Sequence, residues 1–119
     1  MRQYLRVAAL LAVWMPVQSN SQTSQPSAKL NCQTGPVKKS YGGAKWLAYS
    51  CDDNRTVVIM AAPNTPAAPF YFMFSLQQGH YQLTGEGTGN QKATDAAYQD
   101  LRALAEKEIV ALIAETKPH

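Results

Sequence analysis

The chain has 119 residues, of which 45% are hydrophobic and 16% charged. About 100 residues remain once the N-terminal targeting segment is set aside, which is the length of one small domain. Without Arg2 and Arg6, which lie in an N-terminal targeting segment, the charged side chains balance at 9 − 8 = +1. The charge therefore gives no reason to expect nucleic acid or an anionic membrane as a partner.

Residues 1–19 have the organisation of a secretory signal peptide. Arg2 and Arg6 form a positive n-region, Val7–Met15 is apolar throughout, and "VQS" at 17–19 supplies a cleavage site. The apolar run is less than half of the ~20 residues that a membrane-spanning helix needs. We expect a periplasmic or secreted protein with no stable membrane insertion after cleavage. A Ser/Gln-rich leader at 20–28 then precedes a single domain at 29–117, whose oligomeric state the sequence leaves open.

Two cysteines, Cys32 and Cys51, remain after signal removal. An even count in an exported protein predicts one disulfide, which would close a loop of about twenty residues. Metal ligation and a redox dithiol are the alternatives. Two sulfurs with no CxxC motif and no nearby histidine make a poor zinc site, so we expect a structural disulfide and no metal or cofactor.

Short apolar runs alternate with turn signals over the first two thirds of the domain. Gly42-Gly43 and Gln78-Gly79 are typical of hairpin turns, and the three prolines of residues 63–69 predict a stiff loop. The strands expected around them are residues 37–41, 45–51, 55–62, 70–76 and 80–86.

The second hairpin has a testable register. A two-residue turn at Gln78-Gly79 pairs Gln77 with His80, and the remaining pairs then sort by polarity. One face is apolar, and Gly85 lies on it under the ring of Phe72. Its pairs are Leu76 with Tyr81, Phe74 with Leu83 and Phe72 with Gly85. The other face pairs Ser75 with Gln82, Met73 with Thr84 and Tyr71 with Glu86.

The last third changes to a helical period. From Thr94, taken as the N-cap, apolar residues recur every three or four positions as far as Ile113. Glu108 falls inside this apolar arc, so either it lies at the rim or the helix breaks near Ala105–Glu108. We favour one helix with a kink. The fold class is then α+β, an antiparallel sheet of about four to five strands, arranged as a meander of hairpins, with a C-terminal helix packed on one face. The face that carries Phe70, Phe72, Phe74, Tyr81 and Leu83 would meet the helix.

The glycine-rich stretch "LTGEGTGNQKAT" at 83–94 resembles a nucleotide-binding loop only superficially. A dinucleotide fingerprint needs a third glycine where this chain has Asn90, and a P-loop needs a lysine directly after a glycine. No parallel strand is expected after the helix. We interpret the stretch as a connector between strand and helix.

No catalytic set is evident in the sequence. His80 lies beside a hairpin turn, His119 ends the chain, and Asp52-Asp53 is typical of a turn. These observations favour a protein that is not an enzyme. The alternative is a small envelope hydrolase in which Glu86 pairs with Asp52 or Asp53, as two carboxylates do in glycosidases.

Binding is the remaining class of function. The polar face of the second hairpin offers Tyr71, Met73, Gln82, Thr84 and Glu86, and Tyr and Met are enriched at interfaces. Trp46 is a further candidate, because the first hairpin pairs it with Lys39 and leaves open which face is outside. We expect a non-enzymatic binding, inhibitor or envelope-accessory protein whose partner is a periplasmic or extracellular protein.

Residues 49–60, "YSCDDNRTVVIM", resemble the Tyr-x-Cys strand of periplasmic inhibitors of c-type lysozyme. Those inhibitors insert a serine-rich glycine-arginine segment into lysozyme, and this chain lacks it. The expected C-terminal helix also departs from their small β-barrel. The resemblance therefore covers this strand alone, and no residue role is transferred from it.

Overall fold

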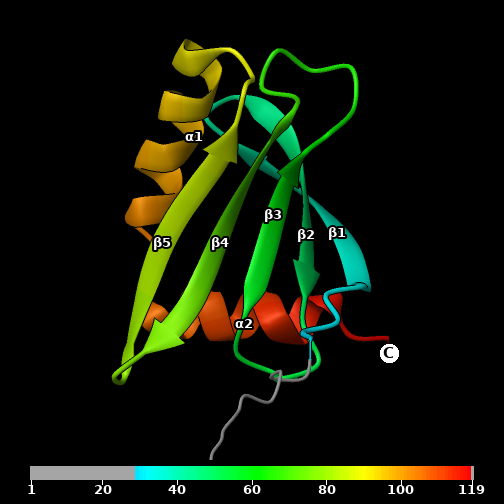
Figure 1. Cartoon of the computed structure of the whole chain (residues 1–119), viewed down its shortest axis with the longest axis vertical. Helices are drawn as coiled ribbons and strands as arrows, with labels where there is room; N and C mark the ends of the chain where they lie inside the picture. The colour runs from blue at the N-terminus through cyan, green and yellow to red at the C-terminus, as the bar shows by residue number, and fades with distance from the viewer. Residues whose placement is uncertain (1–28, 119) are drawn as a thin grey trace, which may run out of the picture.

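The computed structural model describes residues 29–118, so the expected signal peptide (1–19) and leader (20–28) lie outside the described residues. A five-stranded antiparallel sheet runs in the order β1-β2-β3-β4-β5, and two helices follow it (Figure 1). The bounds are β1 Thr34–Tyr41, β2 Ala44–Ser50, β3 Val57–Ala61, β4 Phe70–Gln77, β5 His80–Gly87, α1 Gln91–Arg102 and α2 Glu106–Thr116. The predicted α+β meander is confirmed.

Both predicted two-residue turns are present. Gly42 and Gly43 have φ angles of 62° and 79°, and Gln78 and Gly79 have φ angles of 53° and 82°. Left-handed conformation at both turn positions is the type I′ geometry that suits the twist of paired strands. The register predicted for β4 and β5 is confirmed at every pair from Gln77↔His80 to Tyr71↔Glu86.

The core lies between one face of the sheet and the two helices. We call this the inner face, and the sheet face away from the helices the outer face. The Phe72 ring packs at a tilt against Trp46, with ring centroids 5.3 Å apart, and stacks on Tyr98 of α1 at 6.3 Å. A Cβ at Gly85 would come within 2.8 Å of the Phe72 ring, as the register predicted. Leu101 of α1 and Ile109, Leu112 and Ile113 of α2 complete the core.

The C-terminal third forms two helices, so the expectation of a single kinked helix was wrong. The chain leaves helical conformation at Ala103 and is extended at Ala105, where the φ and ψ angles are −76° and 158°. A continuous helix over residues 91–116 would be about 39 Å long. The five strands span only about 20 Å, so such a helix would overhang the sheet. The break lets both halves bury their apolar stripes on the inner face.

Side chains at the two helix starts explain where the helices begin. The Asn90 side chain accepts a hydrogen bond from the backbone N–H of Ala93 at 3.1 Å, so Asn90 and not Thr94 is the N-cap of α1. Glu108 accepts a hydrogen bond from the backbone N–H of Ala105 at 2.7 Å. This charge in the apolar arc therefore marks the start of α2.

Polar contacts fix α2 across β1 and β2. The Thr116 hydroxyl donates to the carbonyl of Ile113 at 2.6 Å, which leaves its oxygen to accept from the Ser50 hydroxyl, also at 2.6 Å. Both side chains of this pair are buried. Lys39 forms an ion pair with Glu115 at 3.1 Å. In Figure 1, α2 passes behind the strands near one end of the sheet.

The predicted disulfide joins Cys32 to Cys51 and ties the segment before β1 to the end of β2. In the following turn, the Asp53 carboxylate accepts hydrogen bonds from the backbone N–H groups of Arg55 and Thr56 and from the Thr56 hydroxyl. Burial alone would raise the pKa of Asp53, but these hydrogen bonds together hold it below its ordinary value. Asp53 is therefore a structural residue of the turn.

Candidate functional site

The outer face of the sheet carries apolar side chains on its three central strands. Strand pairing aligns Leu47, Met60 and Tyr71 in one row across β2, β3 and β4, and Tyr49, Val58 and Met73 in the next row. Met60 is exposed, at 45%, and the other five side chains are half-buried. No element formed by residues 29–118 covers this face, because both helices pack on the inner face (Figure 1).

Most residues that the sequence proposed for binding lie together on this face. The β4–β5 register places Tyr71 opposite Glu86 and Met73 opposite Thr84, and Gln82 follows one pair further along. The three β5 residues are exposed and form a polar margin beside the apolar rows. The sequence therefore identified one side of the outer face.

Trp46 does not belong to this surface. It pairs with Lys39 as predicted, but the pair faces the helices, and Trp46 is 0% exposed. Its ring packs on Phe72, and its indole N–H donates to the carbonyl of Tyr41 at 3.2 Å. Lys39 turns to Glu115 on α2 and not to the tryptophan ring. Because the indole satisfies its one donor inside the core, Trp46 is removed from the candidate binding face.

Strands β2 and β3 contribute apolar residues that the sequence did not assign to the face, namely Leu47, Tyr49, Val58 and Met60. The alternation in "KWLAYS" offered two apolar sets, with Trp46 and Ala48 in one and Leu47 and Tyr49 in the other. Either set could have faced the core. In the structure, the set with Trp46 and Ala48 faces the helices and is buried, and the set with Leu47 and Tyr49 lies on the outer face.

Tyr71 and Glu86 form the polar corner of the face. The Tyr71 hydroxyl donates to the Glu86 carboxylate at 3.1 Å across β4 and β5. This hydrogen bond, together with the negative charge, raises the pKa of Tyr71 above its ordinary value. The pair presents one anionic group and one phenol ring to the solvent, which is a combination suited to recognition.

A groove of about 490 Å³ opens beside this corner, under the proline-containing loop between β3 and β4. Its walls are mostly apolar, and Glu86 is its one charged residue. The lining is Met60, Ala61, Pro63, Ala68, Pro69, Phe70, Tyr71, Glu86, Gly87 and Thr88. The groove extends the apolar rows toward one end of the sheet, so a partner on the outer face could also place a side chain here.

Positive and negative side chains lie at opposite edges of the outer face. Lys38 of β1 pairs with Leu47, and Lys45 of β2 pairs with Ser40, so both lysines lie at the β1–β2 side of the face. Glu86 lies at the opposite side, on β5. The face is thus positive at one margin, apolar in the middle and negative at the other margin.

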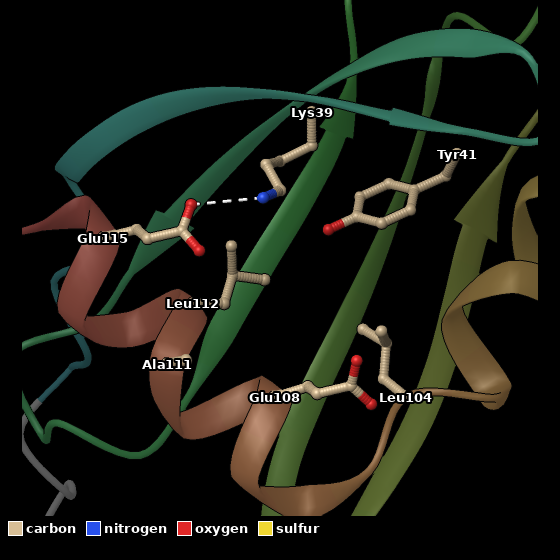
Figure 2. Close-up of a pocket in the computed structure, with 7 residues that line it drawn as sticks. All are labelled: Lys39, Tyr41, Leu104, Glu108, Ala111, Leu112 and Glu115. Carbon is tan, nitrogen blue, oxygen red and sulfur yellow. Dashed lines mark hydrogen bonds and ion pairs between the residues drawn. The ribbon is translucent and has the colours of Figure 1, made fainter.

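A second hollow, of about 250 Å³, lies between β1, α2 and the connection that precedes α2 (Figure 2). Lys39 and Glu115 pair with each other in it, and Glu108 is held at the start of α2 by its hydrogen bond to Ala105. Burial, with the nearby Glu115 carboxylate, raises the pKa of Tyr41 to about 12. The phenol therefore stays protonated at ordinary pH. The three charged side chains of this hollow already have partners within the protein, so we do not propose it as a catalytic site.

The carboxylates of the alternative hydrolase are not brought together. Val57 of β3, Phe74 of β4 and Leu83 of β5 lie side by side in one row across the sheet. Glu86 lies three residues further along β5, on one side of this row. Asp52 and Asp53 lie in the turn that precedes Val57, on the other side of the row. The distance between either aspartate and Glu86, measured along the strand direction, is therefore more than about 10 Å. Paired glycosidase carboxylates are no more than about 9.5 Å apart. The structure therefore does not assemble this pair, and it places His80 exposed beside its turn.

The glycine-rich connector is tied to the proline-containing loop. The backbone N–H groups of Thr88 and Gly89 both donate to the carbonyl of Pro69 at 2.9 Å, and that of Asn90 donates to Pro66 at 2.9 Å. A Cβ at Gly89 would overlap the backbone of Ala67. Glycine at this position thus allows close approach of two loops, and these amides have protein partners in place of a phosphate.

Neither a metal site nor a membrane-spanning helix is found among the described residues. Within 29–118, no three His, Cys, Asp or Glu side chains gather closely enough to hold a metal ion. Neither α1 nor α2 has the length and hydrophobicity of a membrane-spanning helix.

Comparison with protein-family models, with curated proteins and with solved structures found no match to this chain.

Proposed function

We propose that this chain is an exported, non-enzymatic binding protein that recognises another protein with the outer face of its sheet. The observation that carries the proposal is a sheet face with two apolar rows that no residue of 29–118 covers. Monomeric proteins rarely expose a contiguous apolar surface of this kind unless it binds something. A polar margin around an apolar centre is also the usual anatomy of an interface.

The disulfide supports the part of the proposal that concerns location. Disulfides such as Cys32–Cys51 form and persist in oxidising compartments, which include the periplasm and the extracellular medium. The signal-like segment at 1–19 agrees with export, and a periplasmic or secreted location would place the outer face among envelope or extracellular proteins.

The proposal is tested by capture with matched surface variants. Oxidised protein would be immobilised as wild type, as Met73→Glu and as Val110→Glu, and exposed to the host's envelope extract and to labelled copies of the same chain. Met73 is central in the outer face, whereas Val110 is 52% exposed on α2, outside it. Circular dichroism would verify that each variant is folded.

A partner bound by wild type and by Val110→Glu, but held at least about tenfold less by Met73→Glu, is the expected result. A loss of this size corresponds to about 1.4 kcal/mol, which a charge buried in an apolar interface readily exceeds. Equal binding by all three proteins would contradict the outer face as the site. Absence of any partner would contradict the binding function.

A further inference from the structure

The outer face has a chemical order across the strands that identifies a partner. From β1 to β5, one row reads Lys38, Leu47, Met60, Tyr71, Glu86. It begins with a cation, passes through Leu47, Met60 and the ring of Tyr71, and ends with an anion. The next row reads Tyr49, Val58, Met73, Thr84 from β2 to β5. A half-turn about an axis through Met60 and along the strands reverses the order of this row. A second copy rotated in this way therefore places its Glu86 opposite Lys38 and its Lys38 opposite Glu86.

We propose that the partner of the outer face is a second copy of this chain, packed face to face about a two-fold axis close to the direction of β3. The inference rests on the proposed function, since it names the occupant of the same surface. A two-fold axis in this direction brings β1 of one copy over β5 of the other, β2 over β4 and β3 over β3. An interface of this kind uses one self-complementary patch on both copies.

The side chains that meet in this arrangement match in charge and in size. Lys38 of each copy lies over Glu86 of the other, and Met60 meets Met60 on the axis. In the same row, Leu47 lies over Tyr71. In the second row, Tyr49 lies over Met73, and Val58 meets Val58. Each tyrosine is therefore opposite a flexible aliphatic side chain, which favours interdigitation of the kind found between the two sheets of a β-sandwich.

The charges argue against the other two-fold arrangement. An axis perpendicular to the strands and along this row would place β1 over β1 and β5 over β5, so Lys38 would meet Lys38 and Glu86 would meet Glu86. Like charges at such short range disfavour association. Within one copy, Lys38 and Glu86 are separated by four strand spacings, or about 19 Å, so their attraction is not satisfied inside the monomer.

The area is sufficient for a weak but specific dimer. The face is about 20 Å wide and about 20 Å long, which gives roughly 1,000 Å² in total for the two copies once the relief of the side chains is included. A specific interface should bury at least about 1,000 Å², and interfaces below about 1,200 Å² are typical of weak, transient complexes. Sheets that pack face to face keep their strands about 30° apart, so the two-fold axis would be inclined by about 15° to β3, with β1 still over β5.

Sedimentation velocity over about 1 µM to about 1 mM, a range that brackets micromolar affinity, tests the inference. Wild type is expected to pass from monomer to dimer over this range. Lys38→Glu and Glu86→Lys should each weaken the dimer at least about tenfold, because each reversal creates two like-charged contacts. The double variant Lys38→Glu/Glu86→Lys should recover most of the lost affinity. Both sites are exposed, so these substitutions are expected to leave folding intact.

Recovery in the double variant is the decisive result, because it arises only if the two positions face each other between copies. A wild type that stays monomeric throughout, or single reversals with no effect on a dimer, would overturn the inference. The outcomes also separate the two proposals. A monomeric wild type whose envelope partner is lost on Met73→Glu leaves the binding function standing and refutes the second copy as occupant. A dimer that Met73→Glu does not weaken forms through another surface and refutes the second copy as the occupant of this face.

Discussion

A methyl group at Gly42 probes how the turn between β1 and β2 positions α1. Gly42 has a φ of 62°, and its backbone N–H donates to the Asp100 carboxylate at 2.6 Å. A Cβ here would overlap the backbone of Ala96 and Ala97 in α1. Because the overlap is with the main chain of a helix, no change of rotamer relieves it, and the helix must move.

The expected magnitude has two parts. Left-handed conformation costs an alanine about 1 kcal/mol relative to glycine. Overpacking against a fixed neighbour adds about 1–3 kcal/mol. Gly42→Ala should therefore lower the free energy of unfolding by about 2–4 kcal/mol. Gly43, the next residue, has a φ of 79° and would meet nothing within 4 Å. Gly43→Ala should cost only the conformational part, about 1 kcal/mol.

Urea unfolding of the oxidised proteins, followed by far-ultraviolet circular dichroism, measures both variants against wild type. The difference between the two variants reports the contact between turn and helix, since the conformational cost is shared. If Gly42→Ala and Gly43→Ala lose the same stability to within about 0.5 kcal/mol, α1 does not rest on this turn and the placement of the inner layer is refuted.

Three other perturbations probe the turn at Asp53, the disulfide and the two faces of β4. The folded state lowers the pKa of Asp53, so its stabilisation is complete above the unfolded pKa of about 4 and is lost as the pH falls through the folded pKa. Asp53→Asn should thus be less stable than wild type at neutral pH, and urea titrations should show the gap closing below about pH 4. A gap that is independent of pH would contradict this. Replacing Cys32 and Cys51 by serine should lower the free energy of unfolding by about 3 kcal/mol in the same assay, because the bond spans 19 positions of the chain; an unchanged midpoint would contradict a structural role. Phe72→Ala should cost about 3–5 kcal/mol and Met73→Ala less than about 1 kcal/mol, since Phe72 is buried in the core and Met73 lies on the uncovered face. Comparable losses would mean that both faces are covered.

The second hairpin was predictable from sequence because two signals agree there. Gln78-Gly79 fixes a two-residue turn, and the apolar residues before and after it alternate in phase with that turn. A shift by one residue would expose three phenylalanines, so only one register buries them. Local turn chemistry and the distribution of apolar residues therefore determine the same pairing.

The break between α1 and α2 was not predictable in the same way. Leu104 and Ala105 are good helix formers, and no glycine or proline lies at the break. The chain leaves the helix because two short helices cover the inner face better than one long one, which is a property of the whole sheet. Glu108 was the one sequence signal of the break, since a carboxylate in an apolar arc fits the start of a helix better than its middle.

The composition of the outer face was only half predictable. On β4 and β5, polar residues mark the solvent side, whereas on β2 both alternating sets are apolar. Choosing between Trp46 and Leu47 for the core requires knowing which side the helices occupy. Strand β2 alone contains no information on that side, because the side is set by packing against residues more than fifty positions away.

The most direct test of the account is photo-crosslinking from the outer face in the host cell. A benzophenone amino acid would replace Met73 in one protein and Val110, exposed on α2, in another. We predict that the probe at Met73 forms a specific adduct, with a second copy or another envelope protein, and that the probe at Val110 does not. Equal labelling from both positions, or an adduct from Val110 alone, would contradict the assignment of the outer face as the binding surface.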